Sequence, residues 1–536
     1  MHYSLLQFLV LLFAAFMLIM LAKKLNIAYP IFLVLAGLVI SYIPGIPYIT
    51  TDPDLIFLIF LPPLLYEAAW YTSWNDFWKW KRPISLLAFG LVIFTSTIIA
   101  FLATAIIPGF TLPMGFLLGG IISPPDAVAA ASVLKNIKIP KRITTILEGE
   151  SLINDASSLI VLRFALAAVL TGHFSMNQVV SEFFVVTFMG IVIGVAVAHV
   201  MYFIHRFLPT TASIDSALTL ISPYFMYLAA EQFHYSGVMA VVSGGLFLSY
   251  RSHEIFTDGQ SRLQTINVWS TVVIILNGLV FILIGLELPT IMKGLEGYSL
   301  AEAWRYGLII SAVVIVIRLL WIYPGTYVPR WLFKSIRTKE PDPGWKNPFI
   351  VGWAGMRGVV SLAAALSLPL LTDAGKGFPH RNLIIFITFV VILVTLVFQG
   401  FTLPLLVKLM NIIDVDPEEP EDQQEMTIKI RLTEVALKRL NEQYFDDIEN
   451  NHLLQVLKTE LQNNVVHATA RLDSLTKGDR HQAQIAVYRK AMKDIYQHQR
   501  KELYLIRREK KFSEEAIRRQ AMQVDLAEMK ILSKKE

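Results

Sequence analysis

The feature that most constrains the fold is a series of long apolar stretches between residues 4 and 411, separated by short polar loops. A helix needs about 20 apolar residues to cross the hydrocarbon core of a bilayer. Thirteen such stretches are present, the second and the ninth of them short: 4–22, 28–43, 53–72, 84–107, 113–134, 143–171, 179–207, 213–231, 235–250, 265–289, 302–324, 347–371 and 382–411. Because 54% of the residues are hydrophobic and only 17% are charged, an ordinary soluble protein is excluded. We therefore expect an all-α membrane protein with about thirteen transmembrane helices.

Basic residues in the loops predict the orientation. Alternate loops, beginning with the one at Lys23 and Lys24, carry seventeen Lys and Arg residues, whereas the opposite loops carry four. Loops rich in Lys and Arg stay in the cytoplasm, so the N-terminus is predicted outside and the C-terminus inside. The first apolar stretch has no basic segment before it and no small-residue cleavage site after it. We interpret it as a retained span rather than a signal peptide.

The chain ends in a charged part that differs from the apolar part. Residues 1–411 form the predicted membrane domain, and residues 412–426, which include the acidic DVDPEEPEDQQE, form a predicted linker. Residues 427–536 show helical periodicity without a phosphate loop, zinc-ligand spacing or long heptad repeat. We expect a helical cytoplasmic regulatory domain that binds an unknown ligand or stabilises a dimer. The alternative is a solvated appendage with no such role.

Two of the apolar stretches are interrupted by helix breakers at corresponding places. Pro124 and Pro125 interrupt the fifth stretch, because proline has no N–H to donate to the preceding turn. Gly355 and Gly358 weaken the twelfth stretch around Arg357. If stretches 1–6 and 8–13 are two halves, both breaks fall at the same place in each half, as in inverted repeats that build a binding site. A simple kink and a glycine packing face are the alternatives, and the matched positions disfavour both.

Carboxylates lie next to these breaks. Asp126 begins the half-helix after the prolines, where the helix dipole stabilises a negative charge. In EGESLINDASSLI of the sixth stretch, Ser151 and Asp155 share one helix face and Asn154 lies on the neighbouring face. Asp155 is the deepest acid, and a carboxyl group in apolar surroundings keeps its proton nearer to neutral pH, as a proton carrier must. Carboxylate, hydroxyl and amide oxygens also suit a hard alkali cation.

The buried cation Arg357 requires a carboxylate partner at membrane depth. Glu150 is the predicted partner in a structural ion pair, and Glu67 in LPPLLYEAAW is the alternative. Losing one partner of such a pair destabilises the fold, so loss of activity in a variant would not by itself prove a role in the site. No role is assigned to three further charged residues: Glu148, Arg163 and Arg318.

Four motifs occur in order: FLPPLLYEAAW, SPPDAVAA, EGESLINDASS and GMRGVVSLAAAL. Together they resemble the monovalent cation/proton antiporters, specifically the bacterial sodium/proton exchanger branch with an Asn-Asp motif, over roughly residues 5–411. The resemblance implies inverted repeats with two broken helices that cross at mid-membrane. It also implies a homodimer in the bacterial inner membrane and alternating access by an elevator-like movement.

The resemblance also implies residue roles. Asp155 corresponds to the carboxylate that binds ion and proton, with Asn154 beside it; relatives with Asp-Asp there are electrogenic, so Asn154 implies electroneutral exchange. Asp126 and Ser151 correspond to further ligands of the alkali cation, Glu150 and Arg357 to the buried ion pair, and Glu67 to an acid near the ion path. Many relatives have Thr where this chain has Pro125. The hydroxyl of Ser123 or a backbone carbonyl is expected to replace the missing oxygen.

We predict a secondary antiporter that exchanges Na⁺ for H⁺ in contact with membrane lipids, with Li⁺ and K⁺ as the other candidate cations. A K⁺/H⁺ antiporter and a cation channel gated by the C-terminal tail are the alternatives. No enzyme motif is present, and neither a cofactor nor a nucleic-acid partner is expected, since the net charge of +5 fits loop bias. The absence of cysteine excludes disulfides and thiolate sites.

Overall fold

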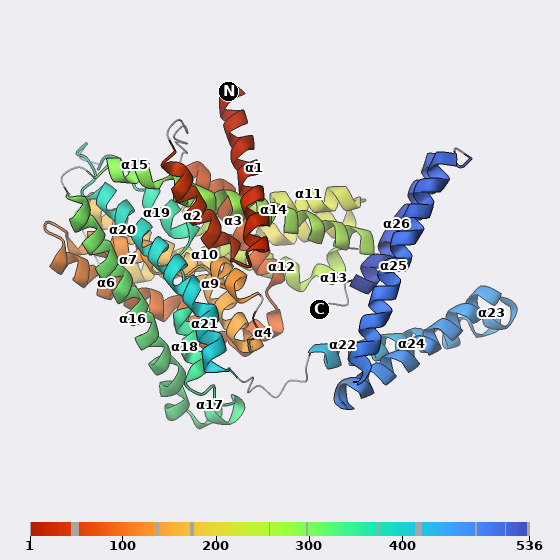
Figure 1. Cartoon of the computed structure of the whole chain (residues 1–536). Helices are drawn as coiled ribbons and strands as arrows, with labels where there is room; N and C mark the ends of the chain where they lie inside the picture. Colours follow the sequence, from red (N-terminus) through yellow and green to blue (C-terminus); the bar gives the residue numbers. More distant parts are fainter. Residues whose placement is uncertain are drawn as a thin grey trace. The chain divides into compact units, whose positions relative to one another are not determined.

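The computed structural model describes residues 2–43, 53–135, 137, 139–171, 176–256, 258–295, 298–372, 375–412, 421–477, 480–509 and 511–532. These residues are helical almost throughout, and among them only an isolated bridge between Leu371 and Gly377 is extended pairing. The chain divides into two compact units, Met1–Asp416 and Pro417–Glu536. Figure 1 shows the first unit as a bundle of helices coloured from red to cyan.

The helices of the first unit follow the predicted apolar stretches. They are α1 (His2–Lys24), α2 (Tyr29–Ser41), α3 (Pro53–Tyr71), α4 (Trp74–Lys79), α5 (Lys81–Ser85), the π-helix η1 (Leu86–Leu91), α6 (Val92–Ile106), α7 (Leu112–Ile122), α8 (Ala127–Leu134), α9 (Lys141–Thr171), α10 (Met176–Phe207), α11 (Ala212–Gln232), α12 (Gly237–Tyr250), α13 (Ser252–Ile255), α14 (Gly259–Leu286), α15 (Leu288–Lys293), α16 (Leu300–Leu332), α17 (Lys334–Lys339), α18 (Lys346–Trp353), α19 (Val359–Leu366), α20 (Arg381–Val394), the π-helix η2 (Thr395–Gln399) and α21 (Gly400–Met410).

Eight helical segments in the described residues are long and apolar enough to cross a membrane, and α2 and α12 are shorter apolar helices. Each of the thirteen predicted stretches coincides with a helix or with consecutive helices. The predicted all-α membrane fold is therefore confirmed. The count of thirteen crossings and the orientation of the termini stay predictions.

Small residues allow close helix contacts, as is usual in membrane bundles. A Cβ atom added to Gly285 of α14 would lie 2.3 Å from the carbonyl oxygen of Val34 in α2. A Cβ added to Gly194 of α10 would lie 2.1 Å from the carbonyl oxygen of Ala240 in α12. These pairs of helices thus pack backbone against backbone, and side chains larger than glycine would separate them.

The buried apolar residues form two main clusters. The larger cluster includes residues of α6, α7, α16, α20 and α21, and the smaller one consists mostly of residues from α3, α10, α11 and α12. Helix α9 contributes to both, since Ile146 and Leu162 belong to the larger cluster and Leu152 and Ala156 to the smaller one. The helix that carries Asp155 therefore lies at the junction of two packed bundles.

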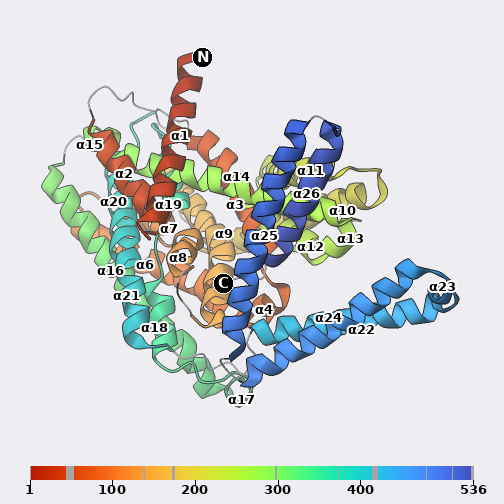
Figure 2. The same ribbon diagram turned by 45° about the vertical axis from the view of Figure 1, so that its right-hand side comes forward.

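The second unit is helical, as predicted. It contains α22 (Glu421–Gln443), α23 (Phe445–Asn450), α24 (His452–Lys477), α25 (Arg480–Glu509) and α26 (Glu514–Leu532). Figures 1 and 2 show α22 lying beside α24 and α25 beside α26. The side chain of Arg500 in α25 donates to Asp525 at 2.7 Å and to Glu528 in α26, which joins the second pair.

The predicted linker 412–426 requires a correction at its C-terminal end. Residues 413–420 lie outside the described residues, and α22 already begins at Glu421. Proline ends the linker at position 420, and the acidic residues that follow are favourable in the first turn of a helix because of the helix dipole. The acidic residues of the predicted linker thus extend into the first turn of α22. The regulatory role of the second unit stays a prediction.

Candidate functional site

The two interrupted stretches form pairs of half-helices that meet at their breaks. Helix α7 ends at Ile122 and α8 starts at Ala127, while α18 ends at Trp353 and α19 starts at Val359. The backbone N–H of Asp126 donates to the carbonyl of Met356 at 2.7 Å. The two breaks are thus hydrogen-bonded to each other, although they lie more than two hundred residues apart in sequence.

Contact between the breaks is so close that a side chain at position 358 would meet the Asp126 carboxylate. A Cβ atom added to Gly358 would lie 1.7 Å from the Oδ2 atom of Asp126. Any larger residue at position 358 would therefore displace the Asp126 carboxylate, since real Cβ contacts are never this short. The glycine that the sequence presents as a helix breaker also makes room for a charged side chain.

Polar side chains satisfy several backbone carbonyls at the first break. The Oγ of Ser123 donates to the carbonyl of Gly120 at 3.2 Å. The Nε of Arg357 donates to the carbonyl of Ile122 at 3.0 Å, and its Nη2 to the carbonyl of Ser123 at 3.4 Å. The Nδ2 of Asn154 donates to the carbonyl of Pro125 at 3.2 Å. Unpaired backbone groups are costly in hydrocarbon, so these contacts make the break tolerable.

Asp126 is held by the half-helix that it begins. Its carboxylate accepts hydrogen bonds from the N–H groups of Val128, at 2.8 Å, and Ala129, at 3.4 Å. This is an N-cap, which also places the negative charge at the positive end of α8. The N–H of Ala127 donates to the Oγ of Ser151 at 3.2 Å. Asp126 and Ser151 thus both accept hydrogen bonds from backbone N–H groups in the first turn of α8.

A cavity of about 740 Å³ opens beside the breaks. Four carboxylates line it: Glu67, Asp126, Glu148 and Asp155. Asp155 is 7% exposed, and its carboxylate makes no hydrogen bond or ion pair with another residue that the structure describes. A buried carboxylate that faces a cavity without a protein partner is able to take a proton or a cation from it. The Oγ of Ser361, which also lines the cavity, has no hydrogen-bond partner among the described residues.

Most of the predicted site residues come together at this cavity. Asp155, Asp126, Ser151 and Glu67 all line it, and Glu148 lies in its wall as an exposed residue. Ser123 and Asn154 do not line it. The Ser123 hydroxyl donates to a carbonyl of its own helix, and the Asn154 amide donates to the Pro125 carbonyl. Both side chains therefore stabilise the backbone at the break and do not face the cavity.

The prediction that Glu150 pairs with Arg357 is wrong. The carboxylate of Glu150 accepts two hydrogen bonds from Arg318, at 2.5 and 2.7 Å, and both side chains are fully buried. Arg318 also donates to the carbonyl of Val351 near the end of α18. Arg357 instead donates to backbone carbonyls at the end of α7 and to that of Gly355. A guanidinium has five donors, and here helix-end carbonyls take the place of a carboxylate.

Two residues that contribute to the site were not assigned from sequence. Arg318 of α16 is one, although an intramembrane arginine is itself a signal of a buried partner. Thr395 of η2 is the other, and its hydroxyl accepts a hydrogen bond from the N–H of Arg357 at 3.0 Å. The π-helix η2 has no clear sequence signal, and such irregular turns occur frequently near functional sites. Arg163, which also had no assigned role, forms an ion pair with Glu231 of α11.

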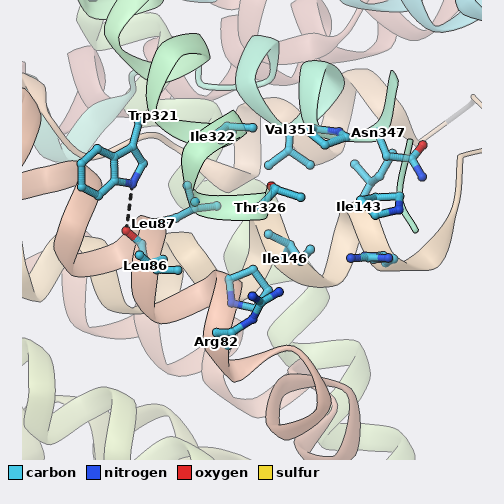
Figure 3. A pocket seen from close by; sticks show the side chains of 15 residues that line it. Arg82, Leu86, Leu87, Ile143, Ile146, Trp321, Ile322, Thr326, Asn347 and Val351 are labelled. Carbon is cyan, nitrogen blue, oxygen red and sulfur yellow. Dashed lines mark hydrogen bonds between the residues drawn. The ribbon is translucent and has the colours of Figure 1, made fainter. Parts of the chain in front are cut away.

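A second, smaller cavity of about 50 Å³ lies between η1, α9, α16 and α18. Figure 3 shows Arg82 at one side of it and the indole of Trp321 donating to the carbonyl of Leu86 at 3.2 Å. No carboxylate lines it. It therefore lacks the anionic ligands that a cation site requires, and the larger cavity is the candidate site.

Comparison with protein families completes this description. A family model described as "Sodium/hydrogen exchanger, transmembrane" matches residues 10–409. The chain belongs to this family. The match covers both breaks and every lining residue of the larger cavity, and the sodium/hydrogen exchanger family is one of membrane exchangers rather than enzymes. Neither the family match nor the described residues indicate a resident cofactor.

Individual members of the family extend this comparison. The sodium, potassium, lithium and rubidium/H(+) antiporter of Bacillus pumilus is 34% identical over 394 residues, which are 71% of this chain and 58% of that protein. The Na(+)/H(+) antiporter ApNhaP of Aphanothece halophytica is 32% identical over 78% of this chain and 76% of its own length. The solved structure of the sodium proton antiporter MjNhaP1 from Methanocaldococcus jannaschii aligns with a TM-score of 0.60 at 20% identity, covering 75% of this chain and 99% of that one. That structural likeness shows the fold.

Proposed function

We propose that this exchanger is a secondary antiporter that moves Na⁺ against H⁺ across a bacterial inner membrane, with Li⁺ and K⁺ as the other candidate cations. The observation that carries the proposal is the carboxylate of Asp155, which is buried, faces the larger cavity and has no partner among the described residues. Asp126 and Ser151 lie in the same cavity wall and supply further oxygens. Sodium and hydrogen ions are also the ions in the description of the family.

Competition for Asp155 couples the two fluxes. The carboxylate binds either a proton or a cation, and each occupant neutralises its charge. When neither is bound, an unpaired charge would have to cross an apolar region, which is unfavourable. Exchange therefore requires no energy source other than the two gradients. Because the neighbouring residue is Asn154 and not a second acid, we propose that one cation is exchanged for one proton without net charge movement.

Elevator-type alternating access agrees with the packing. The hydrogen bond from Asp126 to Met356 joins the two breaks, so both are expected to move together. The cavity is lined by Tyr71, Thr72, Lys135 and Thr144, which lie next to loops predicted to be cytoplasmic. We therefore propose that this is the inward-facing state. A homodimer in contact with membrane lipids is proposed as the functional unit.

Exchange in proteoliposomes tests the proposal. We expect wild-type protein to convert an imposed Na⁺ gradient into a pH change, and Asp155→Asn to abolish that change while the protein still elutes as a folded species. Asp258→Asn is a matched control, because Asp258 caps α14 away from the cavity and Asn is an equally good N-cap. Cation-driven pH change in Asp155→Asn at the wild-type rate would contradict the mechanism.

Cation choice and electroneutrality are tested in the same assay. Na⁺, Li⁺ and K⁺ are compared, because one relative is named for exchange of sodium, potassium, lithium and rubidium. We expect the rate to be unaffected by an imposed membrane potential. A tail-gated channel is the alternative function, and it would carry current without a pH change. Truncation after Asp414 shows whether the helical tail alters the pH dependence of exchange.

A further inference from the structure

Another cavity lies on the other side of half-helix α19. It has a volume of about 20 Å³ and is lined by aliphatic residues of α14 and α19 together with the carboxylate-bearing Glu287. Val359 and Ala363 line both this cavity and the larger one that holds Asp155. The first turn of α19 therefore borders both the candidate ion site and the cavity at Glu287.

Glu287 is an intramembrane acid that no structural contact explains. It lies between α14 and α15 and is half-buried, and its carboxylate makes no hydrogen bond or ion pair with another described residue. It precedes α15 but its side chain accepts no capping hydrogen bond. Four of its cavity neighbours are Val280, Leu283, Leu362 and Leu366. Charged groups in such surroundings are costly and mark ion pathways more often than they stabilise a fold.

The two cavities lie toward opposite ends of the same helices. The larger cavity reaches residues next to predicted cytoplasmic loops, such as Thr72 and Lys135. The smaller cavity reaches the last residues of α14 and α19, whose following loops are predicted outside. A volume of about 20 Å³ holds no more than one water molecule. The space beside Glu287 is thus too small for a hydrated cation in the present state.

We propose that Glu287 is a second cation site, which receives the alkali cation from the outer solution when Asp155 faces outward. The proposal rests on the proposed antiport. Asp126 and α19 are joined by the contact between the breaks, whereas Glu287 directly follows α14, which packs on α2 through Gly37 and Gly285. Movement of the first group along the second enlarges the small cavity and reduces the large one. Glu287 then binds the cation on the outer path, as Glu67 in the larger cavity does on the inner path.

Sided kinetics test this assignment. Cation dependence is measured separately on each face of oriented proteoliposomes for wild type, Glu287→Gln and Glu67→Gln. We expect Glu287→Gln to raise the apparent KM for outer Na⁺ about fivefold, with little change on the inner face, because a nearby carboxylate concentrates cations. Glu67→Gln is the matched variant and is expected to show the opposite pattern. Equal changes on both faces for Glu287→Gln, or no change, would overturn the proposal.

Thiol labelling gives a readout that does not depend on transport. The chain contains no cysteine, so Glu287→Cys creates a single thiol. A membrane-impermeant, positively charged thiol reagent is expected to modify it from the outer face and not from the inner face. Modification from the inner face would overturn the assignment. If wild-type protein performs no exchange, the proposed antiport fails, and outer-face labelling still shows whether Glu287 lines an outer path.

Discussion

The two breaks occupy corresponding places in the chain, yet they are built differently. The break between α7 and α8 is made by prolines, and its carboxylate, Asp126, caps the half-helix that follows. The break between α18 and α19 is made by glycines, and α19 begins at Val359 after Gly358, which supplies no side-chain cap. The uncapped start of α19 lies against the carboxylate of Asp126. One break therefore supplies an acid, and the other supplies the space and the helix end that accommodate it.

The ends of the preceding half-helices differ in the same way. Arg357 reaches across from the second break to the carbonyls at the end of α7. The end of α18 receives Arg318, which brings a fully buried carboxylate partner, Glu150. The first end thus contacts an arginine that has no side-chain counter-ion among the described residues, and the second contacts a complete ion pair. Two breaks at corresponding places in the sequence are thus stabilised by different sets of charged side chains.

The largest effect is expected from removing the cation at the end of α18. Arg318→Ala leaves Glu150 buried without a counter-ion, which should lower the free energy of unfolding by about 3–5 kcal/mol. The double variant Arg318→Met with Glu150→Leu should recover most of this loss, because it buries no charge. Thermal unfolding in detergent measures both. If the double variant is as unstable as Arg318→Ala, the carbonyl of Val351 and not Glu150 is the important partner.

Adding one methyl group at the second break should mainly affect transport. Gly358→Ala forces the Asp126 carboxylate to move, so we expect exchange to fall about tenfold or more in protein that remains folded. Gly325→Ala in α16 is the control, because nothing lies within 4 Å of a Cβ atom added there. Initial rates in proteoliposomes measure the effect. Wild-type rates in Gly358→Ala would show that the placement of Asp126 is not important.

Changing the chemistry of the first break should alter cation preference. Pro125→Thr adds a hydroxyl next to Asp126, and we expect the ratio of apparent KM values for K⁺ and Na⁺ to change about threefold, since an added oxygen ligand alters the site for each ion differently. Pro125→Val has a similar shape without the hydroxyl and serves as the control. The same ratio in both variants would mean that relief of the proline constraint, and not the hydroxyl, causes the change.

The smallest effect is expected at Ser123. Its hydroxyl satisfies the carbonyl of Gly120, so Ser123→Ala should destabilise the protein by about 1 kcal/mol and leave the apparent KM for Na⁺ unchanged. Unfolding temperature and transport kinetics on the same preparation measure the two quantities. An increase in KM without loss of stability would restore Ser123 as the cation ligand that the sequence suggested.

Much of the fold and part of the site follow from the sequence for physical reasons. Apolar length and helix breakers act locally, so the helices, the two breaks and the acids beside them are predicted correctly. Which helix faces a given side chain is a long-range property, and helical spacing does not specify it. For this reason the sequence predicts that Glu150 pairs with Arg357, the arginine at the second break, whereas the structure pairs it with Arg318. The Ser123 hydroxyl donates to the carbonyl of Gly120 and does not face the cavity. The sequence does not specify which of these two directions the side chain takes.

The position of α9 between the two apolar clusters has a consequence for speed. Asp155 is followed by Ala156, and the face that contacts the smaller cluster carries this small residue and Leu152. In the proposed elevator movement, α9 is therefore the helix at which one apolar cluster would slide past the other. We expect the turnover rate to depend on this apolar contact and on the surrounding lipid. Stiffening the bilayer should slow exchange while leaving the affinity for either ion unchanged.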